Sequence, residues 1–145
     1  MEKRTQAQEA NIAVARRLAS DVFSKGDMKS FDEIFADDYV NHNIPVPGVT
    51  GTKAGFRELV LATRKAFPDV SVEVQDVVAD GDFVVFHDSV TATSRGEFFG
   101  VPPNGKRLDW TEIHFLRLAN GKIIEHWTNF DQVRILQQLG VIPSQ

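Results

Sequence analysis

The sequence predicts an α+β fold, in which a curled antiparallel sheet forms a cone closed by three N-terminal helices, with a short C-terminal helix after it. Two observations predict it. Residues 5–67 carry apolar side chains mainly at helical spacing, whereas residues 70–131 alternate with the period of two that is typical of strands. Helices and strands are thus segregated along the chain, which favours α+β over βαβ. The chain of 145 residues is expected to form one domain, residues 1–145.

Three helices are predicted before the sheet. Residues 5–24 carry apolar side chains along one side, as an amphipathic helix does. A short second helix follows from about Ser30, which can cap it, and a third begins near Thr52. Between them, residues 39–43 form a brief extended segment before a turn at residues 44–48, where two prolines forbid a helix.

The second half of the chain is predicted to contain four strands: residues 70–79, 83–93, 108–118 and 123–131. Asn120-Gly121 is the strongest short hairpin signal, because both central residues of a type I′ turn need a positive φ. This turn places Ala119 opposite Lys122. The further pairs expected on that face are Leu116 with Glu125, His114 with Trp127, Glu112 with Asn129 and Trp110 with Asp131. A helix then follows and ends at Gly140.

This predicted hairpin face is too polar for a dry core. It combines two tryptophans, a histidine, an amide and three carboxylates, and burying charge without partners is costly. The face is therefore expected either to be wet or to line a pocket.

Composition excludes several classes of function. Cysteine is absent, so disulfides and thiolate sites are excluded. The net charge of -4 argues against a nucleic-acid partner. No apolar run approaches the ~20 residues of a membrane span, and a soluble, cytoplasmic protein is expected. The histidines lack metal-ligand spacing, and the glycines of residues 96–105 precede no helix, so neither a metal nor a cofactor is expected.

Several short segments occur together along most of the chain: Gly48-Val49-Thr50-Gly51, Ala66-Phe67-Pro68-Asp69, Gly100-Val101-Pro102-Pro103 and Gly121-Lys122-Ile123-x-Glu125-His126-Trp127-x-x-x-Asp131. From about Ala13 to Gly140, this combination resembles the SnoaL-like polyketide cyclases, also labelled ester cyclases, of the nuclear transport factor two-like superfamily. The resemblance implies the α+β cone. It also implies cofactor-free closure of a ring by intramolecular aldol condensation in a hydrophobic, carbonyl-rich molecule, and a homodimer.

The resemblance assigns a general acid/base role to an aspartate at the end of the last strand, which Asp131 matches, with His114 matching a nearby strand histidine. Asp131 also has a plainer interpretation, because it stands where an aspartate caps the following helix. If it is catalytic, partial burial against aromatic surface should raise its pKa. Likewise, His114 is either a pocket residue oriented by Glu112 or a satisfied core histidine.

The remaining candidates are expected to bind substrate. Trp110 and Trp127 could form an apolar wall, with Asn129 and Asn41 as hydrogen-bonding groups. The other two candidates are His42 and His87. Alternation points His42 away from Asn41 and Asn43, and His87 shares its side of a strand with Phe83 and Val85.

Other functions remain open at this point. The same cone could serve an isomerase, a dehydratase or a hydrolase, although epoxide hydrolysis normally needs an Asp-Arg-Asp set and the polar face contains no arginine. A binding protein that holds an apolar ligand without converting it is the alternative outside the enzymes, and the fold does not separate these possibilities.

Overall fold

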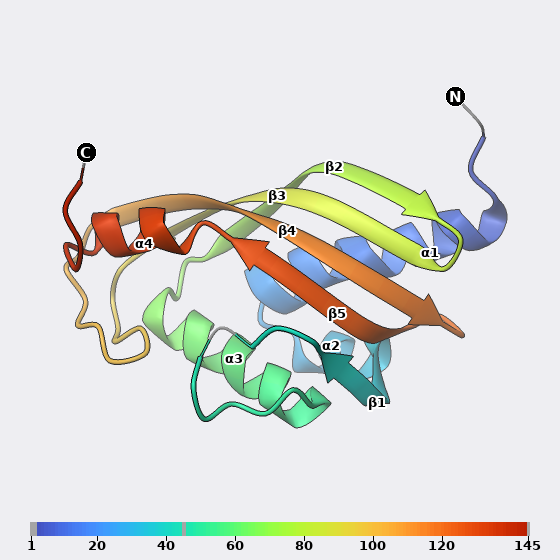
Figure 1. Cartoon of the computed structure of the whole chain (residues 1–145), viewed down its shortest axis with the longest axis horizontal. Helices are drawn as coiled ribbons and strands as arrows, with labels where there is room; N and C mark the ends of the chain where they lie inside the picture. Colours follow the sequence, from blue (N-terminus) through green and yellow to red (C-terminus); the bar gives the residue numbers. More distant parts are fainter. Residues whose placement is uncertain (1–2, 45, 145) are drawn as a thin grey trace.

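The computed structural model describes residues 3–44 and 46–144. Its helices are α1 (Gln6–Arg17), α2 (Met28–Ile34), α3 (Lys53–Ala66) and α4 (Gln132–Gln138), and a π-helical segment, η1 (Leu18–Ser24), directly continues α1. Its strands are β1 (Phe35–Asn41), β2 (Ser71–Asp80), β3 (Phe83–Thr93), β4 (Arg107–Ala119) and β5 (Lys122–Phe130). The predicted α+β order is confirmed, with three helices before the main sheet and one after it (Figure 1).

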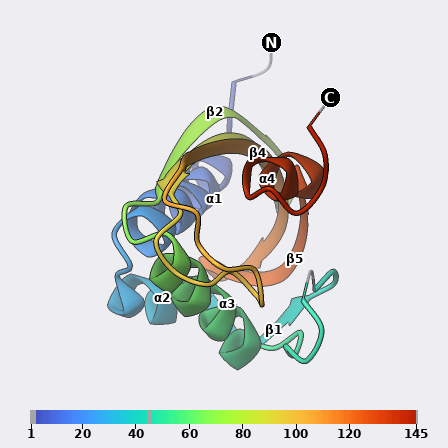
Figure 2. The ribbon, with the colours of Figure 1, turned by 90° about the vertical axis from the view of Figure 1, so that its left-hand side faces the viewer.

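The five strands form one curled sheet in the order β1-β5-β4-β3-β2, with β1 parallel to β5 and the other pairs antiparallel. Seen from one end, the sheet is strongly curved, and the three N-terminal helices lie along the side that it leaves open (Figure 2). The segment α1–η1 packs on β2, and α3 packs on β1. The long twisted strands make this curl favourable.

Side chains near the helix starts explain where the helices begin. Thr5 caps α1 in a capping box with Gln8, and the Thr52 hydroxyl accepts from the Gly55 N–H at 3.2 Å. The expected cap of α2 is wrong. Asp27 caps it instead, accepting from the N–H groups of Lys29 and Ser30 at 3.0 and 3.1 Å.

The first strand differs from the predicted extended segment at residues 39–43. It begins at Phe35 and runs beside the last strand of the chain, with Phe35 and Tyr39 buried. This pairing joins segments far apart in sequence, so local pattern does not reveal it. The predicted turn at residues 44–48 includes Pro45, which lies outside the described residues.

The predicted register of the hairpin β4–β5 is right at the turn and wrong beyond it. Asn120 and Gly121 both have positive φ, 52° and 75°, as the type I′ turn requires. Leu118 still faces Ile123, but the next pair is Arg117 with Glu125. Strand β5 therefore contains one extra residue, a β-bulge, which reverses the face to which all later residues point.

The bulge exchanges the residues that reach the concave side. His114 faces Thr128 and Glu112 faces Phe130, where Trp127 and Asn129 were predicted. His126, fully buried, also belongs to the inner set. Within residues 3–44 and 46–144, no helix combines the length and apolar character that crossing a membrane requires.

Candidate functional site

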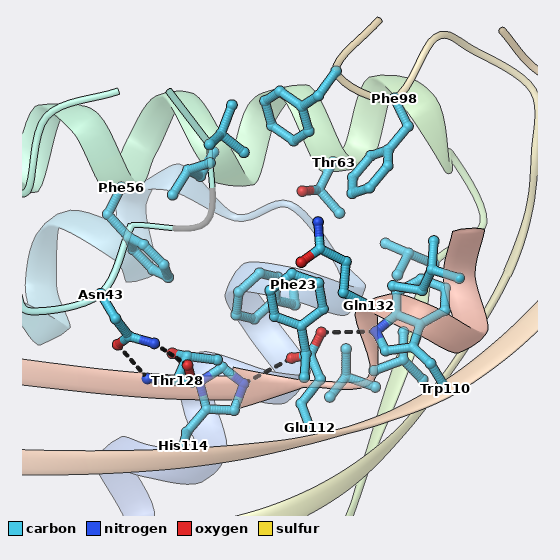
Figure 3. A pocket seen from close by; sticks show the side chains of 18 of the residues that line it. Phe23, Asn43, Phe56, Thr63, Phe98, Trp110, Glu112, His114, Thr128 and Gln132 are labelled. Carbon is cyan, nitrogen blue, oxygen red and sulfur yellow. Dashed lines mark hydrogen bonds and ion pairs between the residues drawn. The ribbon is translucent and has the colours of Figure 1, made fainter. Parts of the chain in front are cut away.

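A largely apolar cavity of about 520 Å³ lies between α3, the concave face of the sheet and α4 (Figure 3). This volume is within the range of about 300–1,000 Å³ that is typical of small-molecule sites. Its apolar walls include Phe23, Phe56, Leu59, Phe98, Trp110 and Ile135. The walls therefore offer mainly apolar and aromatic contacts.

Polar side chains gather along the β4–β5 side of this cavity. They are Asn41, Asn43, Glu112, His114 and Thr128, and Thr63 and Gln132 line other parts of the wall. Of the described residues that line the cavity, Glu112 and His114 alone titrate. Any acid/base chemistry on a molecule in the cavity therefore falls to these two residues.

A chain of hydrogen bonds fixes Glu112 and His114 in place. His114 Nε2 lies 2.8 Å from Glu112 Oε2, and the indole N–H of Trp110 donates to Glu112 Oε1 at 2.8 Å. On the other side of the imidazole, His114 Nδ1 lies 2.8 Å from His126 Nε2, and His126 Nδ1 lies 2.8 Å from Tyr39 Oη. Both oxygens of the carboxylate and both nitrogens of each imidazole are thus engaged.

The environment sets the charges of the catalytic candidates. Burial is the largest influence on Glu112 and pushes its pKa up, but the hydrogen bonds from His114 and Trp110 and the charge of His114 outweigh burial and lower it. Burial likewise acts against the imidazolium of His114, but the hydrogen bond and charge of Glu112, with the charge of Asp88, raise its pKa. Both shifts favour the charged forms, a carboxylate on Glu112 and an imidazolium on His114.

The second histidine carries no charge. Burial, and then the charge of His114, lower the pKa of His126 well below its ordinary value. A neutral imidazole has one N–H, so when His114 carries two protons its Nδ1–H donates to His126 Nε2. The proton of His126 then lies on Nδ1, toward Tyr39, whose own pKa burial raises.

A second carboxylate lies behind the pair, outside the cavity lining. Asp88 is fully buried on β3, directly opposite Glu112 on β4, and its Oδ2 is 3.6 Å from His114 Nε2. Within the described part of the chain, neither of its oxygens has a hydrogen-bond partner. Burial raises the pKa of Asp88 to about 7. The positive charge of His114 acts against this rise, and the negative charge of Glu112 adds to it.

The three groups are close enough together for a divalent cation, since ligand atoms of Asp88, Glu112 and His114 lie within 4.8 Å of one another. The same lone pairs, however, already serve the hydrogen bonds from His114 and Trp110 to Glu112. We treat the group as a cluster that shares protons and assign no metal to it.

Asp131 lies outside this cavity. Its side chain is exposed, and one carboxylate oxygen accepts from the Arg134 N–H at 3.0 Å at the start of α4. The partial burial expected of a catalytic Asp131 is therefore wrong, and the alternative interpretation as a helix cap describes its position. Whether it also acts on a substrate stays a prediction for substitution to test.

The other predicted site residues divide between the two faces of the sheet. Trp110, Glu112, His114 and Asn41 line the cavity as expected. Trp127 lies on the convex face instead, where it stacks on His42 with ring centroids 4.4 Å apart. His42 also lies 2.9 Å from Glu125 through its Nε2.

Two further candidates are on the surface rather than in the site. Asn129 is exposed and is not part of the cavity lining, because the bulge turned it outward. His87 lies on the outer side of β3, 3.7 Å from Asp76 and half-exposed. For Trp127, His42, Asn129 and His87, the geometry therefore gives no contact with a molecule in the cavity.

Sequence reasoning missed four members of the cluster: Asp88, His126, Thr128 and Tyr39. Alternation along residues 83–93 would have found Asp88, because it shares its side of the strand with Val84, Phe86 and Val90. A lone aspartate in such an apolar stripe is a signal. The other three depend on the bulge or on the pairing of β1 with β5, and no local signal reveals them.

The curled sheet and the helices thus enclose an apolar cavity that has a hydrogen-bonded glutamate–histidine pair at its polar side. The family model of the SnoaL-like polyketide cyclases matches residues 13–139. The chain belongs to this family.

Known relatives agree with this assignment. The chain is 30% identical over 122 residues to the nogalonic acid methyl ester cyclase of Streptomyces nogalater, covering 81% of this chain and 89% of the relative. Among solved structures, IdmH of Streptomyces antibioticus, a candidate polyketide cyclase, is 34% identical with a TM-score of 0.76, covering 90% of this chain and 99% of that one. AclR of Streptomyces galilaeus, a candidate hydroxylase, is 29% identical with a TM-score of 0.83, covering 95% and 85%.

Proposed function

We propose that this protein is a cyclase that closes a ring in a hydrophobic, carbonyl-rich, polyketide-like molecule by cofactor-free intramolecular aldol chemistry. The observation that carries the proposal is the hydrogen-bonded pair Glu112–His114 facing an otherwise largely apolar cavity. Membership of the SnoaL-like family and the likeness to a nogalonic acid methyl ester cyclase support the same class of reaction.

In the proposed mechanism, Glu112 acts first as the base and then as the acid. The Glu112 carboxylate removes a proton from the carbon next to a carbonyl, and the resulting enolate attacks a second carbonyl of the same molecule. Glu112 then returns this proton to the alkoxide that forms, which restores the carboxylate. The His114 imidazolium holds Glu112 through their 2.8 Å hydrogen bond and stabilises its negative charge before and after the reaction.

The neighbouring groups are proposed to position these two residues and the substrate. The indole N–H of Trp110 and the imidazole of His114 hold one oxygen of Glu112 each, which fixes the carboxylate plane. Thr128 and Asn41 lie at the polar side of the cavity, where they can hold the carbonyl oxygens. Donors fixed in advance in a dry site cost little reorganisation when charge develops on the substrate.

Product analysis tests the reaction class. Aldol ring closure leaves the mass unchanged, so nogalonic acid methyl ester and related polyketide esters, incubated with the protein, should give a product of equal mass with a new retention time and absorption spectrum. Glu112→Gln should slow this conversion by about 10²–10⁴-fold, the usual contribution of a general acid/base.

Other products would replace the proposal with one of its rivals. A product that had lost water without forming a new ring would indicate a dehydratase, and one that had gained water a hydrolase. No arginine occurs among the described cavity-lining residues, which disfavours the Asp-Arg-Asp set of epoxide hydrolysis. A ligand recovered unchanged from a stoichiometric complex would identify a binding protein.

We also propose that the protein is a homodimer that covers the convex face of the sheet. Ile113 is 50% and Phe115 39% exposed there, and Phe115 contacts Trp127 edge to face with centroids 5.5 Å apart. Aromatic residues gathered on an exposed face are typical of an interface. A second copy would bury them.

A further inference from the structure

Asp88 is the feature of this molecule that packing does not explain. It shares the concave side of β3 with Val84, Phe86 and Val90, all buried, and is itself 0% exposed. Both of its oxygens lack a hydrogen-bond partner among residues 3–44 and 46–144. A buried carboxylate in such surroundings is strongly disfavoured unless a charge compensates it or a proton neutralises it.

The compensating charge comes from the acid/base pair. Asp88 Oδ2 lies 3.6 Å from His114 Nε2, on the atom that also contacts Glu112 at 2.8 Å. One imidazole therefore stands between two carboxylates from adjacent strands, since Asp88 and Glu112 are directly paired across β3 and β4. An opposite charge at this distance stabilises the charged form of its neighbour.

We propose that Asp88 is a positioning residue for the acid/base pair, whose carboxylate holds the second proton on His114 so that the imidazolium persists beside Glu112. Asp88 does not line the cavity, so it acts through His114 and not on the substrate. The catalytic consequence rests on the proposed function, whereas the effect on the protonation of His114 does not require a substrate.

Among the described residues, four titratable groups face His114 directly or through one neighbour. Glu112 contacts it from the same strand, Asp88 from β3 and His126 from β5. Tyr39 of β1 is linked to it through His126. The helical elements present aromatic rings to this cluster: Phe23 of η1 lies 6.1 Å from His114 between ring centroids, and Phe56 of α3 lies 5.1 Å from His126.

The two carboxylates therefore have different roles. Glu112 is held by two hydrogen bonds and faces the cavity, so it is the base. Asp88 has a pKa raised by burial to about 7, so it exchanges a proton with solvent or its neighbours near neutral pH. Above that pH Asp88 is an anion and opposes loss of the proton from His114. Without it, His114 should deprotonate at lower pH.

Nuclear magnetic resonance tests this directly. With nitrogen-15-labelled histidine, the ring nitrogens of His114 report its protonation in the parent protein and in Asp88→Asn, which keeps the shape and removes the charge. The pKa of His114 should fall by about 1–3 pH units in the variant, as expected for the loss of an opposite charge within ~4–6 Å. The parent's Asp88 carboxyl carbon should itself titrate near pH 7, a reading that needs no variant.

A matched control isolates the position of the charge. Asp76→Asn removes a carboxylate 3.7 Å from half-exposed His87 on the other face of the sheet, and it should leave the pKa of His114 unchanged. An unchanged His114 pKa in Asp88→Asn would overturn the proposal, as would an Asp88 carboxyl whose titration leaves the ring nitrogens of His114 unaffected in the parent. So would stoichiometric Zn²⁺ binding that Asp88→Asn abolishes, because it would make the cluster a metal site. None of these results depends on whether the protein is a cyclase.

Discussion

Replacing Asp88 with Asn should change how the stability of the protein depends on pH. Burial raises the pKa of Asp88 from 3.8 to about 7. A carboxyl whose pKa is raised in the folded state contributes stability that is fully present below pH 3.8 and is lost as pH rises to about 7. Asn at this position does not titrate, so the variant lacks this dependence.

The magnitude follows from the size of that pKa change. At ~1.4 kcal/mol for each pH unit, a change of about three units corresponds to about 4 kcal/mol. Parent and variant should therefore be similarly stable near pH 4, whereas near pH 8 the variant should be more stable by up to about 4 kcal/mol. Loss of the favourable charge beside His114 reduces this difference, so the figure is an upper bound.

Urea denaturation at the two pH values measures the difference, because the other titrating groups are common to both proteins. Asp76→Asn, the exposed control, should stay within about 0.5 kcal/mol of the parent at both pH values. A difference between parent and Asp88→Asn that is the same at pH 4 and pH 8 would refute the reasoning, since it would mean that Asp88 titrates alike in the folded and unfolded states.

Three further predictions concern other parts of the molecule. Asp131→Ala should cost about 0.5–2 kcal/mol in urea denaturation because it removes the cap of α4, whereas Asp131→Asn, which can still cap, should not. Turnover should fall at alkaline pH, because His114 loses its proton at a pH above its ordinary pKa of 6.5. It should also fall at acid pH, because Glu112 gains a proton at a pH below its ordinary pKa of 4.5. An alkaline limit below pH 6.5 would contradict the assignment of His114. Phe115→Asp should convert a dimer to a monomer in analytical ultracentrifugation, and a parent protein that sediments as a monomer would remove the proposed interface.

The fold could be predicted because its signals are local. The change from helical to alternating spacing near Pro68 separates helices from strands, and the positive φ values of Asn120 and Gly121 confirm the hairpin turn. The third helix begins next to Thr52, as predicted, and Thr52 caps it. The parallel pairing of β1 with β5 joins residues about ninety positions apart, and no local pattern contains that information.

The site was predicted only in part because the register of β5 was not fixed by its pattern. Ile123 and Ile124 are both apolar, and each side of the strand beyond them mixes aromatic with polar residues. Hydrophobic alternation therefore does not show which side of β5 faces the cavity, and the β-bulge determines it instead. Residues of β4, Trp110, Glu112 and His114, were placed correctly because that strand has no bulge.

The place of Asp131 in the sequence did not predict its place in the structure. The end of the last strand is a plausible place for a catalytic carboxylate, and the resemblance assigned it that role. The side chain is instead exposed at the first turn of α4, whereas Glu112 supplies the carboxylate inside the cavity.

Comparing two matched substitutions tests the central claim, that the acid/base centre is the Glu112–His114 pair inside the cavity. Glu112→Gln and Asp131→Asn each exchange one carboxylate for an amide of the same shape, and kcat on a converted polyketide ester is measured for both. Glu112→Gln should lower kcat by about 10²–10⁴-fold, whereas Asp131→Asn should remain near the parent rate. The reverse order, with Asp131→Asn inactive and Glu112→Gln near the parent rate, would contradict the account.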